Sequence, residues 1–378
     1  MGLTKCRLGE HIELRVETNA NLTYGVEYVR GVNNLKKLMP TKADINGRDL
    51  TKFQIVLPGD FVFNHRTSRN GSKFSIAYNN GDAPVICTED YVVFRIKEQS
   101  KEVLLDEWLY MFFNRSEFDR YVITNSWGSS TEFYNWEDVC DIEMELPMLS
   151  VQQRFVDIYK AMVENQQCYE QGLSDLVLLY EGYLDKLRSS ESFRRIGDHI
   201  ELIESRNEML EYGIESVKGV SIEKIFIDTK ADMTGVSLKP YYVVRPNEFA
   251  YVPVTSRNGG KISLAINDSD QTYICSSSYV VFKSKDEDIL YPQYLMLFFS
   301  RSEFNRYARF NSWGSARETF DWSEMCDVEI PIPELKVQRA IAEIFSVYNE
   351  RKKINELLKA QIKNICPVLI RGSLEYGG

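Results

Sequence analysis

The chain repeats itself over most of its length. Residues 7–94 match residues 195–282 without a gap, and 40 of the 88 aligned pairs are identical. After a deletion of two residues the match continues, so that RSEF (115–118) recurs at 301–304. Two copies are too few for a solenoid, which needs about three or more stacked repeats. The duplication therefore predicts two similar domains, each followed by its own connector.

Each copy begins with about 145 residues of strand-like character. ICTEDYVVFRI (86–96) and YICSSSYVVFK (273–283) are rich in β-branched and aromatic residues and are typical of strands. CDIEMEL (140–146) alternates apolar and acidic residues, which predicts a strand with one wet face. The segment 104–121 has apolar residues at helical spacing and predicts one helix. Each copy is thus expected to hold an α+β domain.

A long helical pattern follows in each copy. Apolar residues three or four positions apart form the seam of a coiled coil, with Asn165 and Arg351 at polar seam positions. Each helix of roughly 35 residues would be about 50 Å long at 1.5 Å per residue, and Pro367 is expected to end the second. The simplest partner for each seam is the other helix, so the expected architecture is an antiparallel coiled coil with pseudo-twofold symmetry. The seam residues are Val151, Phe155, Ile158, Met162, Tyr169, Leu176 and Tyr183 in the first helix, and Val337, Ile341, Ile344, Tyr348, Leu358, Ile362 and Ile365 in the second.

Composition excludes several classes of protein. No apolar run reaches the roughly 18 residues of a membrane span, and the N-terminus lacks a signal-peptide core, so a cytoplasmic protein is expected. A metal site is improbable, because the chain has only three histidines and its seven cysteines include no CxxC pair. Cys87 and Cys275 are interpreted as buried core residues. A net charge of −10 argues against DNA binding by the bare chain, unless basic residues cluster or a partner supplies positive charge.

The order of motifs resembles that of type I restriction–modification specificity subunits. The strand-loop GDFVFNHRTSRNG (59–71), the later Gly-Ser loop, and the entries into the long helices, MELPMLSVQQRF (144–155) and VEIPIPELKVQRAI (328–341), carry this resemblance. It implies two target-recognition domains and two helical spacers, and a non-catalytic subunit that reads a two-part site on double-stranded DNA. It also implies two adenine methyltransferase subunits and restriction/translocase subunits as partners, which handle the cofactors. The expected segments are 1–149 (first recognition domain), 150–190 (central helix), 191–334 (second recognition domain), 335–371 (C-terminal helix) and 372–378 (tail).

Two loops present in both copies are the candidate DNA contacts. TSRNG offers arginine and asparagine for phosphates or base edges, and NSWGS offers hydroxyls, amides and an indole. TSRNG is equally typical of a β-turn, and the tryptophan of NSWGS is equally typical of a core residue. The candidates are Thr67, Ser68, Arg69, Asn70, Lys73, Asn125, Ser126, Trp127 and Ser129 in the first copy, and Thr255, Ser256, Arg257, Asn258, Lys261, Asn311, Ser312, Trp313, Ser315 and Arg317 in the second.

Positions that differ between the copies are candidates for base choice. His65 and Arg66 align with Pro253 and Val254, and Asn33 and Lys37 also differ from their counterparts. Other repeated residues are interpreted as structural: Trp136 and Trp322 as core residues, and His11 and His199 as hydrogen-bonding residues.

No catalytic motif stands out. The chain has no NPPY-type methyltransferase motif, no GxGxxG and no GxxxxGK[ST], which favours a recognition protein without cofactors of its own. Three alternatives stay open: the specificity module of a type IIB-like restriction system, a coiled-coil scaffold that binds proteins rather than DNA, and an enzyme with an unrecognised site.

Overall fold

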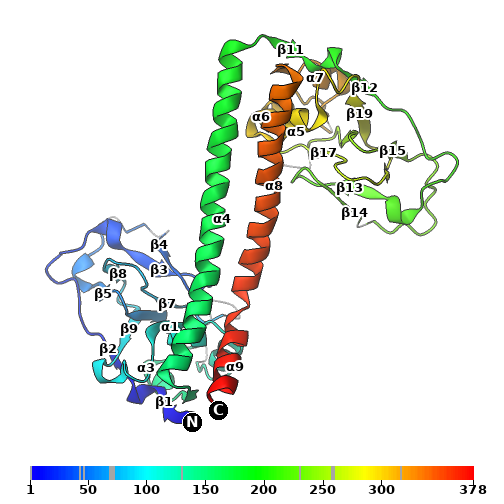
Figure 1. The fold of residues 1–378 in the computed structure, drawn as a ribbon. Coiled ribbons are helices and arrows are strands. Elements are labelled where there is room, and N and C mark those ends of the chain that lie inside the picture. The colour runs from blue at the N-terminus through cyan, green and yellow to red at the C-terminus, as the bar shows by residue number, and fades with distance from the viewer. Residues whose placement is uncertain are drawn as a thin grey trace. The chain divides into compact units, whose positions relative to one another are not determined.

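The computed structural model describes residues 2–41, 44–45, 47–67, 73–128, 131–229, 231–256, 260–315 and 317–378. Two β-rich parts alternate with two long helices along the chain (Figure 1). The first part and its helix comprise β1 (Thr4–Arg7), β2 (Ile12–Leu14), β3 (Arg30–Val32), β4 (Leu38–Pro40), β5 (Gln54–Val56), β6 (Phe61–Asn64), β7 (Ile76–Tyr78), β8 (Val85–Cys87), β9 (Tyr91–Ile96), α1 (Asp106–Phe113), α2 (Ser116–Thr124), α3 (Trp136–Cys140), β10 (Glu143–Leu146) and α4 (Leu149–Ser190).

The second part repeats this order element by element. It comprises β11 (Phe193–Arg195), β12 (Ile200–Leu202), β13 (Lys218–Val220), β14 (Phe226–Asp228), β15 (Tyr242–Val244), β16 (Phe249–Tyr251), β17 (Leu264–Ile266), β18 (Tyr273–Cys275), β19 (Val280–Ser284), α5 (Pro292–Ser300), α6 (Ser302–Phe310), α7 (Trp322–Cys326), β20 (Glu329–Pro331), α8 (Leu335–Lys363) and α9 (Cys366–Gly377). The predicted fold, two tandem α+β domains each followed by a long helix, is confirmed.

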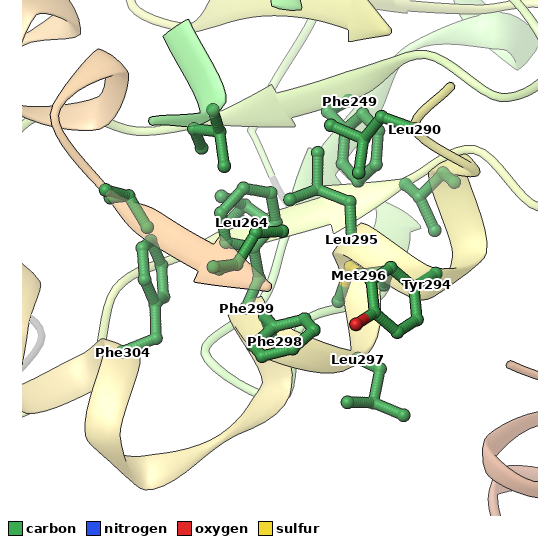
Figure 2. Close-up of a cluster of buried hydrophobic side chains, with 14 of the residues drawn as sticks. Phe249, Leu264, Leu290, Tyr294, Leu295, Met296, Leu297, Phe298, Phe299 and Phe304 are labelled. Atoms are coloured by element: carbon green, nitrogen blue, oxygen red, sulfur yellow. The ribbon is translucent and has the colours of Figure 1, made fainter. Parts of the chain in front are cut away.

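A four-stranded antiparallel sheet forms the centre of each β-rich part. Its order is β2-β9-β6-β7 in the first and β12-β19-β16-β17 in the second. Aromatic residues on the two central strands of each sheet pack against each other. The ring centroids of Phe61 and Phe94 are 5.1 Å apart, and those of Phe249 and Phe282 are 4.8 Å apart. Figure 2 shows how α5 adds Leu295 and Phe299 to the second of these cores. Cys87 and Cys275 are fully buried, as expected.

Contacts along the chain define two compact units. The first contains residues 1–169 and 354–378, and the second contains residues 170–353. Each unit therefore holds one β-rich part, one portion of α4 and one portion of the C-terminal helices. In the first unit, Trp108 donates a hydrogen bond to the hydroxyl of Ser373 at 3.1 Å, and Leu369 and Ile370 of α9 lie in the core. In the second unit, Leu184 and Leu187 of α4 lie in the core in the same way.

The paired helices run antiparallel within each unit. In the first unit, Arg154 donates to the hydroxyl of Tyr376 at 3.0 Å. In the second, the ring of Tyr180 packs against those of Phe345 and Tyr348, each at 5.9 Å. Residue numbers fall along one helix as they rise along the other, so the predicted antiparallel pairing is confirmed.

The predicted polar positions in the seam are wrong by a few residues. Asn165 and Arg351 are exposed, and the polar pair in the seam is formed by Gln166 and Asn355, whose amides are 3.0 Å apart. Asn355 is only 2% exposed. The apolar stripe drifts around the helix because 3.6 residues per turn do not divide evenly into a heptad, and Ile158, Tyr183 and Val337 are accordingly exposed.

Two expected helix ends also differ. The helix expected over 104–121 is two helices, since Arg115 is extended and folds its guanidinium over the ring of Phe112 at 3.8 Å. The second long helix, α8, ends at Lys363, shortly before Pro367 as expected, and Pro367 then lies in the first turn of α9, where a missing N–H costs no hydrogen bond. Residues 372–377, placed in a tail by the sequence, are part of α9.

A buried glutamine ties each β-rich part to the start of its long helix. The amide of Gln152 accepts from the N–H of Leu105 at 3.0 Å and donates to the carbonyls of Val103 and Pro147 at 2.7 and 2.8 Å. Gln338 makes the same three contacts in the second part. This explains physically why both helix entries contain a proline followed five residues later by glutamine.

Candidate nucleic-acid interface

The NSWGS segment of the first copy forms an exposed hairpin after α2. Trp127 and Phe133 exchange two backbone hydrogen bonds, of 3.1 and 2.9 Å. The outer edge of this hairpin pairs with the chain that leads into TSRNG: the N–H of Thr67 donates to the carbonyl of Glu132 at 2.9 Å. The hairpin therefore lies beside Thr67, the first residue of TSRNG, although the two segments lie about sixty residues apart in the sequence.

The second copy builds the same arrangement. Trp313 and Thr319 exchange backbone hydrogen bonds of 3.1 and 2.9 Å, and the N–H of Thr255 donates to the carbonyl of Glu318 at 2.9 Å. The juxtaposition of the two loops is thus a property of the repeated domain.

Both hairpin tryptophans project into solvent. Trp127 is 73% exposed and Trp313 is 63% exposed, so the interpretation of these residues as core is wrong. Trp136 and Trp322 instead pack against the core, with ring centroids 5.6 Å from Phe94 and 5.4 Å from Phe282. An exposed indole repeated on two domains of one chain is a typical recognition feature, since exposure of a large aromatic ring stabilises nothing within the domain.

The glycine after each tryptophan is required by the backbone. Gly128 and Gly314 have φ angles of +153° and +140°, which side chains other than hydrogen rarely adopt. A Cβ at Gly128 would collide with the carbonyl of Thr131, and one at Gly314 with the carbonyl of Arg317. These glycines therefore allow the tight turn that presents the indole.

The asparagine and serine before each tryptophan hold the hairpin onto its helix. Asn125 donates to the carbonyl of Tyr121 at 2.8 Å, and Ser126 to that of Val122 at 2.7 Å. Asn311 and Ser312 repeat these bonds at the end of α6. These side-chain bonds tie each hairpin to the last turn of its helix, so in this conformation they position the tryptophan.

The other candidates are placed differently by the structure. Thr67 is buried and its hydroxyl has no hydrogen-bond partner among the described residues, whereas Thr255 donates to the carbonyl of Glu318 at 3.3 Å. Lys73 is half-buried, and Lys261 forms an ion pair with Glu223 at 2.8 Å. Ser256, Ser315 and Arg317 are exposed. Six candidates lie outside the described residues: Ser68, Arg69, Asn70, Ser129, Arg257 and Asn258.

Two of the four candidates for base choice border the hairpin. The ring of His65 lies 5.4 Å from that of Phe133, and burial, followed by the charge of Arg66, lowers the pKa of its imidazole. Arg66 forms an ion pair with Asp90 at 3.1 Å. Its backbone pairs with that of Phe133.

The other two candidates lie at the tip of the β3–β4 hairpin. The side chain of Asn33 accepts from the N–H groups of Leu35 and Lys37 at 2.9 and 3.0 Å. Lys37 is exposed. Asn33 therefore stabilises the turn, while Lys37 extends from it.

Sequence reasoning missed one charged residue beside the second hairpin. Arg309 of α6 forms an ion pair with Glu318 next to Trp313. The repeat places Ile123 at the corresponding position of the first copy, so a comparison of the two copies along this helix would have found it.

Within the described ranges, no cluster of three or more histidine, cysteine, aspartate or glutamate side chains could hold a metal ion. No helix there is long and apolar enough to cross a bilayer. His11 makes the expected structural bond, with its Nδ1 3.2 Å from the hydroxyl of Ser100.

Comparison with known proteins relates part of the chain to a protein family. Residues 225–364 match the model of the type I restriction modification DNA specificity domain. The chain contains a type I specificity domain. Since 40 of 88 aligned residues are identical between the halves and the sheet order is the same, the first half repeats the fold of the half that contains this match. The model that residues 225–364 match describes DNA specificity, which is a recognition role.

One solved structure of a specificity subunit has a similar fold. The type I restriction-modification S subunit from M. genitalium has a TM-score of 0.61 at 12% identity, with 99% of this chain and 96% of that chain covered. The HsdS subunit from Thermoanaerobacter tengcongensis has a TM-score of 0.40 at 16% identity, with 99% and 96% covered. No curated protein sequence matches the chain.

Proposed function

We propose that this chain reads a two-part DNA site, with one half of the site contacted by each specificity domain. The observation that carries the proposal is the exposed tryptophan hairpin beside the TSRNG segment, which is present in both domains. Two similar surfaces on one chain suit a target with two separated elements. Residues 1–149 and 191–334 would be the reading domains, and the helices 150–190 and 335–371 would set the distance between the half-sites.

Residues shared by both copies are proposed to hold the DNA backbone, and residues that differ are proposed to choose bases. Phosphate contacts fix register without reading sequence, which fits the identical TSRNG segments. Base choice is proposed for His65 and Arg66, which are replaced by Pro253 and Val254, and for the hairpin residues Asn33 and Lys37.

The chain is proposed to work only with partners. Its net charge of −10 disfavours DNA, whose affinity for proteins comes largely from neutralised phosphates. Two adenine methyltransferase subunits would add positive charge and chemistry, and restriction/translocase subunits would join the same assembly on the site that this chain selects.

The test is DNA binding and methylation by the chain together with its proposed adenine methyltransferase partner. Trp127→Ala and Trp313→Ala should each weaken specific binding at least tenfold, because each removes one exposed aromatic contact. Met209→Ala removes a side chain that is also exposed, 83%, but lies outside the hairpins, and should leave binding unchanged. Unchanged affinity in both tryptophan variants would overturn the proposed interface.

The TSRNG arginines have a separate readout. If Arg69 and Arg257 each neutralise one phosphate, each alanine variant should lower the slope of log affinity against log salt by about 1. A slope unchanged in both variants would remove these loops from the DNA backbone. Sequencing of methylated adenines in the host genome would then give the half-sites themselves.

A further inference from the structure

One lysine that recurs in both domains has an ion-pair partner in the first domain and no hydrogen-bond partner among the described residues in the second. Lys36 and Lys224 occupy matched positions at the tips of the β3–β4 and β13–β14 hairpins, with φ angles of +59° and +61°. Lys36 is only 4% exposed, and its ammonium lies 2.7 Å from the carboxylate of Asp119. It also donates to the carbonyl of Phe113. In the first domain this buried cation is therefore fully partnered.

The second domain lacks the carboxylate. Asn305 stands at the position of Asp119 in the repeat, RSEFN in place of RSEFD. The rest of the local structure is kept: the side chain of Asn305 accepts from the N–H of Ile262, as that of Asp119 accepts from Phe74. The ammonium of Lys224, however, is shielded from solvent and has no hydrogen-bond partner among the described residues. An unpaired buried cation is costly, which indicates a missing anion.

A cavity lies beside the side chain of Lys224. Its volume is about 330 Å³, at the lower end of the range for small-molecule pockets. Its walls come from the β13–β14 tip, the start of α6, and the portions of α4 and α8 that belong to the second unit. Hydrogen-bonding groups of Ser300, Asn305 and Asn349 line it beside the lysine.

The charges around the cavity leave two cations without a carboxylate. Lys261 pairs with Glu223 at 2.8 Å, and Arg301 pairs with Glu181 at 2.7 Å and with Glu303 at 3.5 Å. Within the described ranges, Lys224 and Lys352 form no ion pair. When Lys224 is protonated, these four cations outnumber the three engaged carboxylates, and an anion would balance the excess.

We propose that this cavity is a phosphate-binding site of the second domain, taking a small phosphorylated molecule whose phosphate group contacts Lys224 and Lys352. The first domain has no equivalent site, because Asp119 supplies the anion from within the chain. The site is independent of the proposed DNA contacts, since it does not use the tryptophan hairpin.

Burial gives the site a second signature. Burial, followed by the charge of Lys261, lowers the pKa of Lys224 to about 7. The other charged groups that face it are Arg301, Lys352 and the carboxylates already paired with their cations. A bound anion restores the charged lysine, so binding near pH 8 is accompanied by proton uptake.

The test uses the full chain and inorganic phosphate, with chloride at matched ionic strength as the control. Isothermal titration calorimetry should show saturable phosphate binding to the natural chain. Asn305→Asp places in the second domain the carboxylate that Asp119 supplies in the first, and should weaken phosphate binding more than tenfold while the protein stays folded. The reciprocal Asp119→Asn should leave this site intact.

Two further arms identify the ligand and the proton. A nucleoside monophosphate that binds more tightly than phosphate would show that the cavity accepts the rest of a small molecule. Equal affinity would show that the phosphate group alone is recognised. Sulfate, which does not titrate near neutral pH, should bind with proton uptake in the natural chain and without it in Asn305→Asp. Absence of saturable binding, or equal binding by Asn305→Asp, would overturn the site, whereas DNA binding tests the proposed function separately.

Discussion

Gln152 and Gln338 are single side chains on which the junction between domain and helix depends. Each is fully buried and makes three hydrogen bonds to backbone groups of two segments. Gln152→Leu should lower the free energy of unfolding of its unit by about 1–3 kcal/mol, because the buried N–H of Leu105 and two carbonyls lose their partner. Urea unfolding measures this loss. Gln153→Leu alters an exposed neighbour and should cost little; equal losses in the two variants would show that the buried hydrogen bonds do not matter.

The buried lysine of the second domain predicts a pH dependence of stability. The pKa of Lys224 is about 7 in the folded chain and near 10.5 when unfolded. Between these values the unfolded chain binds more protons, so the free energy of unfolding should rise with pH, by at most about 1.4 kcal/mol per pH unit, and should be flat in this respect below pH 7.

Asn305→Asp provides the matched control for this titration. Its carboxylate favours the charged lysine, raises the folded pKa and should flatten the curve between pH 7 and 9.5. Urea unfolding of both proteins across this range gives the difference between them, in which titrations common to both cancel. Parallel curves would show that the lysine is already charged at neutral pH.

At the scale of helices, the polar pair in the seam fixes register. Gln166 and Asn355 bond each other inside an otherwise apolar contact. Gln166→Leu alone should destabilise the first unit, since Asn355 would keep a buried amide without this partner. The double Leu variant should recover stability, because leucines pack well in such a seam, but should lose specificity of register.

Thermal unfolding of the single and double variants measures the coupling, and disulfide trapping between engineered cysteines reports register. Asn165→Leu is the control, since Asn165 is exposed. A double variant less stable than both single variants would contradict this account.

The internal repeat and the spacing of apolar residues predicted the helices and strands well. The spacing is a local property of the chain, and the repeat is recognised by comparing the two halves. The burial pattern of the predicted strand 140–146 was correct, since alternation fixes which face is buried: Ile142, Met144 and Leu146 are buried as expected. The strand itself is shorter, because β10 comprises only Glu143–Leu146 and Cys140 ends α3. The break at Arg115 was not predicted, because no proline or glycine marks it; Arg115 and its counterpart Arg301 are both extended there.

The candidate site was only half readable from the sequence. The two loops were found because they recur, but a recurring tryptophan can be core or surface, and only the pairing of Trp127 with Phe133 decides it. The seam residue Gln166 was missed by one position, because a heptad template drifts over a helix of 42 residues. The cavity beside Lys224 could not be predicted from the sequence, since it arises where the second copy lacks the carboxylate that Asp119 supplies in the first.

At the scale of the whole chain, each unit is completed by a helical segment from the other half of the sequence. Leu184 of the first half lies in the second core, and Ile370 of the second half lies in the first. These two residues correspond in the repeat. Residues 1–190 alone should therefore form a twofold dimer, in which Leu184 of each copy takes the place of Ile370 in the other.

Analytical ultracentrifugation tests this dimer, and Leu184→Asp should abolish it. With the methyltransferase present, the dimer should direct methylation to an interrupted palindrome made of the first half-site and its inverted copy. A folded monomer would show that the halves are not interchangeable.

Residues near the two ends of the chain are in contact, which bears on the order of the domains along the polypeptide. A Cβ on Gly377 would lie 3.3 Å from the side chain of Leu3, so α9 ends where β1 begins. At the repeat boundary, Glu191 and Ser192 connect α4 to β11. This covalent connection is the counterpart of the contact between α9 and the start of β1. The chain can thus be described as four parts in cyclic order: domain, helix, domain, helix. A permuted chain that starts at residue 191 and joins residue 378 to residue 2 through a short glycine linker should fold and select the same DNA site, with its domains in reversed order along the polypeptide. Altered half-sites in the methylation pattern of such a permutant would show that the position of the chain ends matters.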